Sequence, residues 1–267
     1  MSNVLLEAKN LTMQFGGLKA VDGLSFQIKQ GELAGLIGPN GAGKTTVFNM
    51  LTGVYQPTLG SVHLDGLNLN GKKPFEISHL GLTRTFQNIR LFKGLTVIEN
   101  VLIAGHQHIT YSLFSSFFLA EKFLKQEDEL FSRARELLKI FGLASKENEK
   151  ASSLPYGEQR KLEIVRALMT KPKMILLDEP AAGMNHSETH TLMDLIARIR
   201  KEFNLTVLLI EHDMKLVMGI CENIIVLDHG CKIEEGNPQR VQNSKKVIEA
   251  YLGVDEENSK GHGEAHR

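Results

Sequence analysis

The chain has 267 residues, of which 42% are hydrophobic and 23% are charged, and its formal net charge at pH 7 is zero. This length is enough for one large α/β domain, and the zero net charge argues against a nucleic-acid surface built on bulk positive charge. We expect neither a signal peptide nor a membrane span, because no basic stretch precedes an apolar run and no run reaches the ~18–20 apolar residues that a bilayer requires.

The first predicted elements are short strands bounded by turn residues such as Gly, Asp and Gln. They lie at Leu5–Ala8, Leu24–Ile28 and Ser61–Leu64. An apolar run at residues 33–37 reads as a further strand. We expect the three short strands to form a small antiparallel sheet packed beside this fourth one.

Residues 38–45 match the pattern G-x-x-x-x-G-K-[ST] and lie between the strand at 33–37 and a predicted helix at 46–51. Glycines in such a loop let backbone N–H groups surround phosphate oxygens. The helix N-terminus and Lys44 add positive charge, and the Thr45 hydroxyl can ligate Mg²⁺. The sequence therefore predicts a nucleoside triphosphate site made of Gly38, Pro39, Asn40, Gly41, Ala42, Gly43, Lys44, Thr45 and Thr46.

Residues 95–154 differ in character from the rest and predict an inserted helical subdomain. Thr96 precedes a helix at 97–105 and has Glu99 three residues later, the spacing of a capping box. A second helix is expected at 127–141, where apolar residues recur at helical spacing. Between them, the aromatic-rich stretch Tyr111–Leu119 either meets a membrane partner or packs inside the subdomain, and the sequence leaves both possibilities open.

Strands and helices alternate after the insert. Helices are predicted at 158–170 and 187–203, and strands at 174–177, 206–210 and 224–227. This alternation is typical of a mostly parallel sheet. The polar residues 255–267 show no periodicity and predict a disordered tail.

Two carboxylates follow the predicted strand at 174–177. Asp178 is placed to reach the Mg²⁺ shell, and Glu179 to direct the water that attacks the γ-phosphate. Solvated acids at a strand end are the alternative. Together with the phosphate loop, the pair predicts that the nucleotide is hydrolysed.

The segment 154–160 reads LPYGEQR and stands at the start of a predicted helix, upstream of Asp178. Together with the phosphate loop it resembles the signature of ATP-binding cassette (ABC) proteins, whose common form is LSGGQ. The resemblance implies an α/β fold with a P-loop NTPase (RecA-like) core, a small antiparallel β subdomain and an inserted α-helical subdomain. It also implies one ATP-binding domain over 1–254, with its core at 1–94 and 155–254, and ATP held between two such domains. Gly157 matches the glycine that faces the phosphate of the opposite domain, whereas Pro155, Tyr156 and Glu158 depart from the usual pattern.

Further positions match the ABC family one by one. Gln87 falls at the glutamine that touches Mg²⁺ or the attacking water, and His212 at the histidine that bonds the γ-phosphate. Phe15 lies where the family places an aromatic ring against adenine, with a core residue as the alternative. Asn185 stands where aspartate is usual, so no charged role is assigned to it.

A narrower resemblance is to the ATPase subunits of branched-chain amino acid importers, in particular the larger of their two paralogous ATPases. It implies two integral-membrane permease subunits, a second ABC ATPase chain, a solute-binding receptor, and a peripheral place on the cytoplasmic face of the inner membrane. Its cofactors would be ATP and Mg²⁺, and no nucleic acid is expected. The resemblance is carried by residues 15–21, 84–92, 180–185, 210–218 and 247–253.

Other functions remain open at this point. A cassette of the same kind can energise lipopolysaccharide export or uptake of urea or another amide, because the ATPase never touches the solute. A soluble ABC ATPase acting on ribosomes or DNA usually carries two cassettes or a long coiled-coil insertion, and this sequence shows neither. A regulatory module without turnover is disfavoured by the acidic pair and His212, and phosphoryl transfer to a metabolite leaves the signature segment without a purpose.

Overall fold

The computed structural model describes residues 3–106 and 120–260, and it divides into two compact units. The first unit comprises residues 1–74 and 199–267, and the second comprises residues 75–198. The aromatic stretch 111–119 and the last residues, 261–267, lie outside the described residues.

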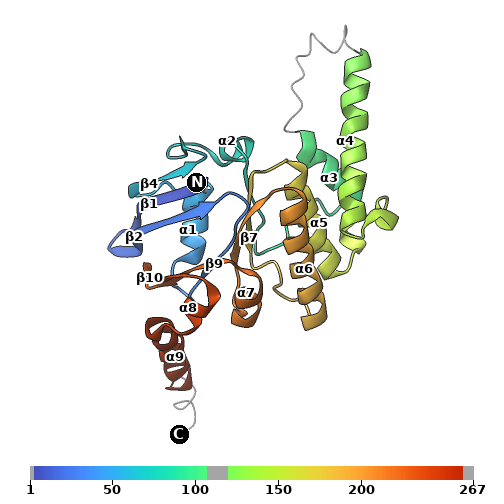
Figure 1. The fold of residues 1–267 in the computed structure, drawn as a ribbon. Coiled ribbons are helices and arrows are strands. Elements are labelled where there is room, and N and C mark those ends of the chain that lie inside the picture. The colour runs from blue at the N-terminus through green and yellow to red at the C-terminus, as the bar shows by residue number, and fades with distance from the viewer. Residues whose placement is uncertain (1–2, 107–119, 261–267) are drawn as a thin grey trace. The chain divides into compact units, whose positions relative to one another are not determined.

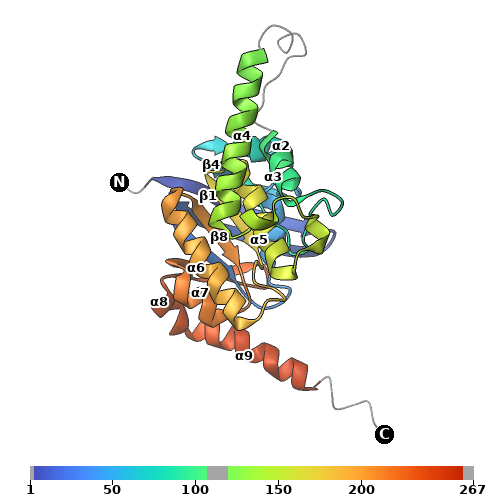
Figure 2. The same ribbon diagram turned by 90° about the vertical axis from the view of Figure 1, so that its right-hand side faces the viewer.

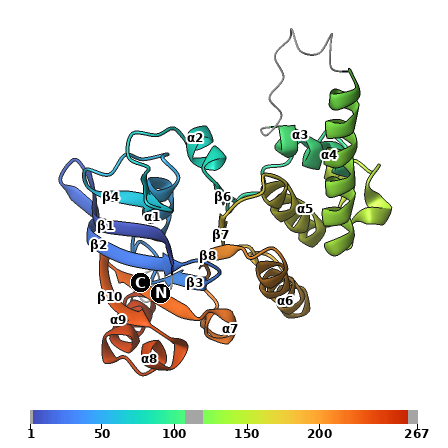
Figure 3. The ribbon, with the colours of Figure 1, turned by 45° about the horizontal axis from the view of Figure 1, so that its top comes forward.

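The first unit contains the expected antiparallel sheet, in the strand order β2-β1-β4-β5 (Figure 3). All three predicted strands lie in it, and the prediction is confirmed. The observed strands run further than the short apolar runs because β1 and β2 continue as a long hairpin through several register shifts. The bounds are β1 Val4–Phe15, β2 Leu18–Lys29, β4 Leu59–Leu64 and β5 Leu67–Asn68.

The same unit also holds parallel strands that carry the phosphate loop. The central strand β3 (Leu33–Ile37) pairs in parallel with β8 (Thr206–Ile210) and with β9 (Asn223–Asp228). Every residue of β3 and β8 is buried, as expected of strands covered on both faces. An antiparallel strand, β10 (Cys231–Gly236), extends the sheet beyond β9.

The helices of the first unit include the one that begins at the phosphate loop, α1. The last helix, α9, contacts α8 and β10 and is drawn in red in Figure 2. It runs to Lys260, so residues 255–260 of the expected disordered tail are helical. The helix begun at Lys245 passes Gly253 and then continues, because residues 254–260 contain neither proline nor glycine. The bounds are α1 Lys44–Leu51, α7 Met214–Ile220, α8 Pro238–Gln242 and α9 Lys245–Lys260.

The second unit combines two parallel strands with a helical cluster. Its strands are β6 (Leu82–Arg84) and β7 (Met174–Asp178). Helices α3, α4 and α5 pack against one another (Figure 1). Helices α2 and α6 lie where the chain passes from one unit to the other. The bounds are α2 Pro74–His79, α3 Val97–Gly105, α4 Ala120–Ile140, α5 Tyr156–Met169 and α6 His186–Glu202, with short 3₁₀ turns η2 Ala144–Lys146 and η3 Ala151–Ser153.

Local signals predicted the helices of this unit well. The Thr96 hydroxyl accepts a hydrogen bond from the Glu99 N–H, and the Glu99 carboxylate accepts one from the Thr96 N–H at 2.7 Å, so the capping box is confirmed. Helix α4 buries its apolar stripe as the spacing predicted, with Ala134, Leu137 and Leu138 all inside.

Candidate active site

At two glycines of the phosphate loop, the neighbouring backbone leaves no room for a Cβ. Gly38 and Gly43 have φ values of 154° and 100°, in the region that L side chains rarely adopt. A Cβ on Gly38 would lie 2.1 Å from the Leu227 carbonyl oxygen, and one on Gly43 would lie 2.5 Å from that of Ala20. Packing against neighbouring backbone therefore determines the shape of the loop.

Lys44 begins helix α1 and is 6% exposed. Its ammonium group donates to the carbonyl oxygens of Gly38 (2.7 Å) and Pro39 (2.9 Å), so the loop itself holds the charge. At the other end of the first unit's chain, the hydroxyl of Tyr251 on α9 accepts a hydrogen bond from the Gly38 N–H, and burial raises the pKa of Tyr251 to about 12. Thr45 is exposed and Thr46 is half-buried beside this loop.

Phe15 lies at the end of β1, where it is 43% exposed. Its ring meets the edge of Tyr55 in a T-shaped contact with centroids 5.4 Å apart. A flat exposed ring with a fixed neighbour can stack on a planar base. The alternative that Phe15 is a core residue is not supported by this exposure, and Tyr55 is a neighbour that sequence reasoning missed.

His212 follows the buried strand β8 and is exposed. The next residue, Asp213, caps helix α7 by accepting hydrogen bonds from the backbone N–H groups of Lys215 and Leu216. The preceding residue, Glu211, is 6% exposed. The histidine is thus presented on a short turn whose two neighbours are held in place.

In the second unit, the structure brings together two of the predicted site residues. The Gln87 side-chain amide donates to the Glu179 carboxylate at 2.9 Å. Glu179 follows the buried strand β7 and has a φ of 49°, a left-handed conformation that costs a non-glycine residue on the order of 1 kcal/mol. A turn closed by the Ala182 N–H and the Glu179 carbonyl (3.1 Å) holds it there. Strain of this kind is typical of functional sites.

Asp178 ends β7 and is 3% exposed. Its carboxylate accepts a hydrogen bond from Arg84 at 2.5 Å, and both side chains are almost fully buried. Sequence reasoning missed Arg84. Nothing in the sequence marks it except its position at the end of β6, the strand that pairs in parallel with β7.

A second arginine that sequence reasoning missed holds the segment around Gln87. Arg160 on α5 is completely buried and donates to the backbone carbonyls of Phe86 (2.7 Å) and Gln87 (2.6 Å). It also pairs with Glu163 at 2.9 Å. Burial raises the pKa of Glu163, and Arg160 acts in the opposite direction. The only sequence signal was a charged pair at helical spacing among apolar residues.

Gly157 lies in the first turn of α5, where a Cβ would meet the end of the Met184 side chain at 3.2 Å. The N-cap residue of this helix is Pro155, which has no side-chain hydrogen bond to offer. Glu158 is engaged elsewhere, since it pairs with Lys146 at 2.6 Å and raises the pKa of that lysine. Of the signature positions, Gly157 is therefore the one that keeps the residue of the family pattern, in which its backbone faces the phosphate of the opposite domain.

Asn185 has a local structural role. Its side chain accepts a hydrogen bond from the Glu188 N–H at 2.9 Å, and the Glu188 carboxylate accepts one from the Asn185 N–H at 3.0 Å. This reciprocal pair caps the start of α6. A neutral asparagine serves such a cap as well as aspartate does.

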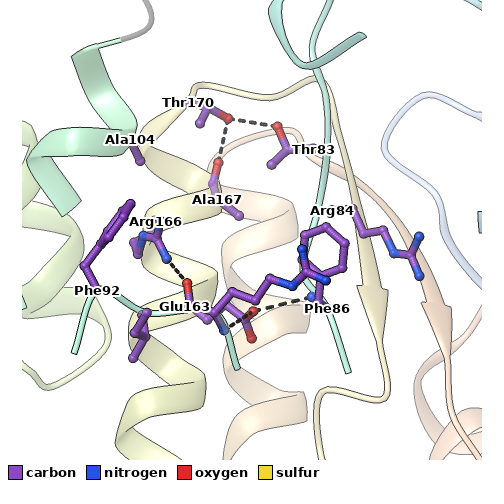
Figure 4. Close-up of a pocket in the computed structure, with 11 residues that line it drawn as sticks. Thr83, Arg84, Phe86, Phe92, Ala104, Glu163, Arg166, Ala167 and Thr170 are labelled. Atoms are coloured by element: carbon purple, nitrogen blue, oxygen red, sulfur yellow. Dashed lines mark hydrogen bonds between the residues drawn. The ribbon is translucent and has the colours of Figure 1, made fainter. Parts of the chain in front are cut away.

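A pocket of about 430 Å³ lies within the second unit (Figure 4). Phe86 and Phe92 form aromatic walls, and Phe92 is 48% exposed. Arginine guanidinium groups lie against both rings, Arg90 at 4.0 Å from the Phe86 centroid and Arg166 at 5.1 Å from that of Phe92. The pocket is therefore both apolar and basic.

The donor chemistry fits Mg²⁺. Among the described residues, no group of three or more His, Cys, Asp or Glu side chains lies together as a metal cage. Mg²⁺ does not need one, because it binds through one or two carboxylates plus substrate phosphates and water. Each unit offers an oxygen ligand of the kind it prefers: the hydroxyl of the exposed Thr45 in the first unit, and the buried carboxylate of Asp178 in the second.

Comparison with known proteins identifies the family. Residues 21–182 match the model described as ABC transporter, and residues 231–257 match that described as branched-chain amino acid ATP-binding cassette transporter. The chain belongs to the ABC transporter family. As an ABC protein it binds and hydrolyses ATP, and its fold class is the one that the sequence predicted.

Relatives of this ABC protein extend the match to nearly the whole chain. The high-affinity branched-chain amino acid transport ATP-binding protein BraF of Pseudomonas aeruginosa is 47% identical over 95% of this chain and 99% of its own. LivG of Escherichia coli, with the same description, is 48% identical over the same shares.

Solved structures agree with this assignment. The ADP conformation of an ATP-binding cassette from an ABC transporter superposes with a TM-score of 0.81 at 34% identity, covering 94% of this chain and 99% of that one. A nucleotide-free cassette gives 0.80 at 33%, covering 93% and 98%. No helix within residues 3–106 or 120–260 of the ABC protein has the length and apolar character of a membrane span.

Proposed function

We propose that this ABC ATPase energises the uptake of branched-chain amino acids through partner permeases. The observation that carries the proposal is the similarity to BraF and LivG, both branched-chain amino acid transport ATP-binding proteins, over 95% of this chain. The match of residues 231–257 to the branched-chain cassette model supports it at the C-terminal end.

In the proposed mechanism, two cassettes face each other, and ATP lies between the phosphate loop of one and Gly157 of the other. Lys44 exchanges the loop carbonyls that it now bonds for phosphate oxygens, a stronger charge-assisted contact. Phe15 stacks on adenine. The other residues of the loop 38–46, except Pro39, which has no N–H, offer backbone N–H groups to the phosphates, and Thr45 and Thr46 add their hydroxyls.

Hydrolysis is assigned to the second-unit acids together with His212. Glu179 orients the attacking water and takes its proton, and His212 bonds the γ-phosphate. Gln87 donates to Oε2 of Glu179, and a carboxylate with two oxygens can accept from this amide and from a water at the same time. Asp178, Thr45 and Gln87 would hold Mg²⁺, which when bound neutralises charge on the phosphates.

The proposed partners are two integral-membrane permeases, a second ABC ATPase chain of the same or a different kind, and indirectly a solute-binding receptor. The ATPase would lie at the cytoplasmic face of the plasma membrane, held there by the permeases. The proposed helical subdomain is residues 95–154, which include all of α3 and α4.

The pocket of the second unit is the proposed seat of a permease segment. Its aromatic walls, Phe86 and Phe92, suit an apolar side chain, and its guanidinium groups suit an acidic side chain or a helix C-terminus. Phe86 directly precedes Gln87, so a segment seated here would sense a movement of the glutamine.

Uptake of radiolabelled leucine in cells that lack the gene tests this function. The wild-type gene should restore uptake, and the Glu179→Gln variant should not, although the purified variant should still bind ATP, because the amide keeps the shape of the carboxylate but cannot accept the proton. Glu149→Gln, at an exposed position away from the acidic pair, is the matched control and should restore uptake. Restoration of urea uptake in place of leucine uptake would transfer the ATPase to the amide importers.

A further inference from the structure

Two oppositely charged side chains meet at the carboxyl ends of β6 and β7. Arg84 and Asp178 are the last residues of these parallel strands, and their Nη2–Oδ2 distance is 2.5 Å. Their side chains are 6% and 4% exposed. The contact is therefore desolvated and belongs to the sheet, not to a mobile loop.

Arg84 pairs with Asp178, whose carboxylate the proposed function assigns to the Mg²⁺ shell. A buried carboxylate without a counter-charge is costly, and removing one partner of a buried ion pair typically leaves a large penalty. The guanidinium of Arg84 supplies such a positive charge to Asp178. A divalent cation at the same carboxylate would place like charges next to each other.

Arg84 also lies near an aromatic ring while it pairs with Asp178. The guanidinium carbon lies 5.2 Å from the centre of the Phe86 ring, within the range of a cation–π contact. Arg84 is one of the residues that line the pocket, and in Figure 4 its side chain points away from the other labelled side chains. The backbone carbonyl of Phe86, the residue before Gln87, accepts a hydrogen bond from Arg160.

We propose that Arg84 is the resident counter-cation of Asp178, and that the Arg84–Asp178 contact and the binding of Mg²⁺ with nucleotide are in competition. The proposal rests on the assigned metal role of Asp178. In it, Arg84 releases the carboxylate when that oxygen group takes a divalent cation. Arg84 is thus a positioning residue that raises the Mg²⁺ concentration needed to occupy half of the sites.

Thermal unfolding of the full chain with a non-hydrolysable ATP analogue tests the proposal. The melting temperature is measured in EDTA and across a MgCl₂ titration for the wild type, Arg84→Gln and Arg84→Lys. The matched control is Arg133→Gln, which removes another partly buried arginine of the second unit that donates to the carbonyl of Leu168 and not to a carboxylate. This readout involves no turnover.

In EDTA, Arg84→Gln should melt about 5 °C or more below the wild type, because Asp178 loses its counter-charge. Mg²⁺ with the analogue should recover most of this deficit, and the Mg²⁺ concentration at half effect should fall about five-fold or more. Arg133→Gln should show a deficit that Mg²⁺ does not change. If Arg84→Gln does not fold, Arg84→Lys decides, since its weaker contact predicts a half-point below that of the wild type.

An equal deficit for Arg84→Gln with and without metal would make the pair purely structural and overturn the proposal. A higher Mg²⁺ half-point in either variant would also overturn it, because Arg84 would then assist the metal. If Mg²⁺ has no effect on the wild type itself, the metal role of Asp178 fails and the competition with it, whereas loss of leucine uptake in Glu179→Gln would still stand.

Discussion

Lys44 shows how a functional charge is kept in place at the scale of a single residue. The ammonium group is nearly buried, yet it satisfies its donors with the carbonyls of Gly38 and Pro39. A buried amine without such partners would lose its charge or unfold the loop. The loop carbonyls therefore hold the Lys44 ammonium group within the loop.

Replacing Lys44 by alanine should weaken ATP binding roughly 10- to 100-fold, which is the value of a charge-assisted hydrogen bond to a phosphate oxygen. Equilibrium dialysis with ATP measures the change in affinity. Lys29→Ala, at an exposed position on β2, is the control and should bind ATP as the wild type does. Unchanged affinity in Lys44→Ala would contradict the assignment of the phosphate loop.

At the scale of elements, helix α5 is tied to the segment that carries Gln87. Arg160 and Glu163 lie one turn apart on the helix, and they bond carbonyl and N–H groups of the same backbone segment. The N-terminal turn of α5 also holds Gly157, the proposed contact to a second ATP. Helix α5, which begins with the signature segment, and the backbone segment 86–90, which carries Gln87, are therefore joined by four hydrogen bonds within the second unit.

Replacing Arg160 by methionine should lower the free energy of unfolding by about 3–5 kcal/mol, because Glu163 loses its buried partner. Denaturant unfolding followed by circular dichroism measures this loss. The double variant Arg160→Met with Glu163→Leu should recover part of it, since no charge is then left buried. If the double variant loses as much free energy of unfolding as the two single variants together, or more, the backbone contacts dominate and not the ion pair.

At the scale of the whole molecule, the chain is expected to be complete only as part of a dimer, because the phosphate loop and the signature segment are proposed to serve different ATP molecules. Such an assembly draws its binding energy from nucleotide that fits the closed state. In the proposed mechanism, the dimer would open when the γ-phosphate is lost. Permease partners in the membrane would then change conformation as the dimer opens.

Gly157→Ala should separate dimer formation from folding. A Cβ there meets the flexible end of Met184 at 3.2 Å and the Glu188 carboxylate at 3.7 Å, and alanine favours a helix over glycine by roughly 0.5–1 kcal/mol, so the monomer should be at least as stable. In a Glu179→Gln background with ATP, however, the added methyl group should prevent the dimer seen by size-exclusion chromatography. Gly219→Ala on α7, where a Cβ meets nothing within 4 Å, is the control and should dimerise. Dimers of normal affinity in Gly157→Ala would remove Gly157 from the interface.

Much of this protein could be predicted from the sequence because its signals are local. The phosphate loop pattern, the Thr96–Glu99 capping box and the buried strand before Asp178 each depend on residues that are neighbours in the chain. Short apolar runs bounded by turn residues predicted the antiparallel sheet, and hydrophobic periodicity predicted the amphipathic helix α4. The disordered tail was placed too early, since polar composition does not by itself end a helix.

Only the tertiary structure decided which charges meet. The pairs Arg84 with Asp178 and Arg160 with the Gln87 backbone join residues far apart in the sequence, and no periodicity marks them. The sequence by itself therefore determined the elements and the chemistry at their ends, through short-range backbone and capping preferences. The counter-charges of that chemistry depend on long-range packing, because a buried group takes its partner from whichever strand or helix folds against it.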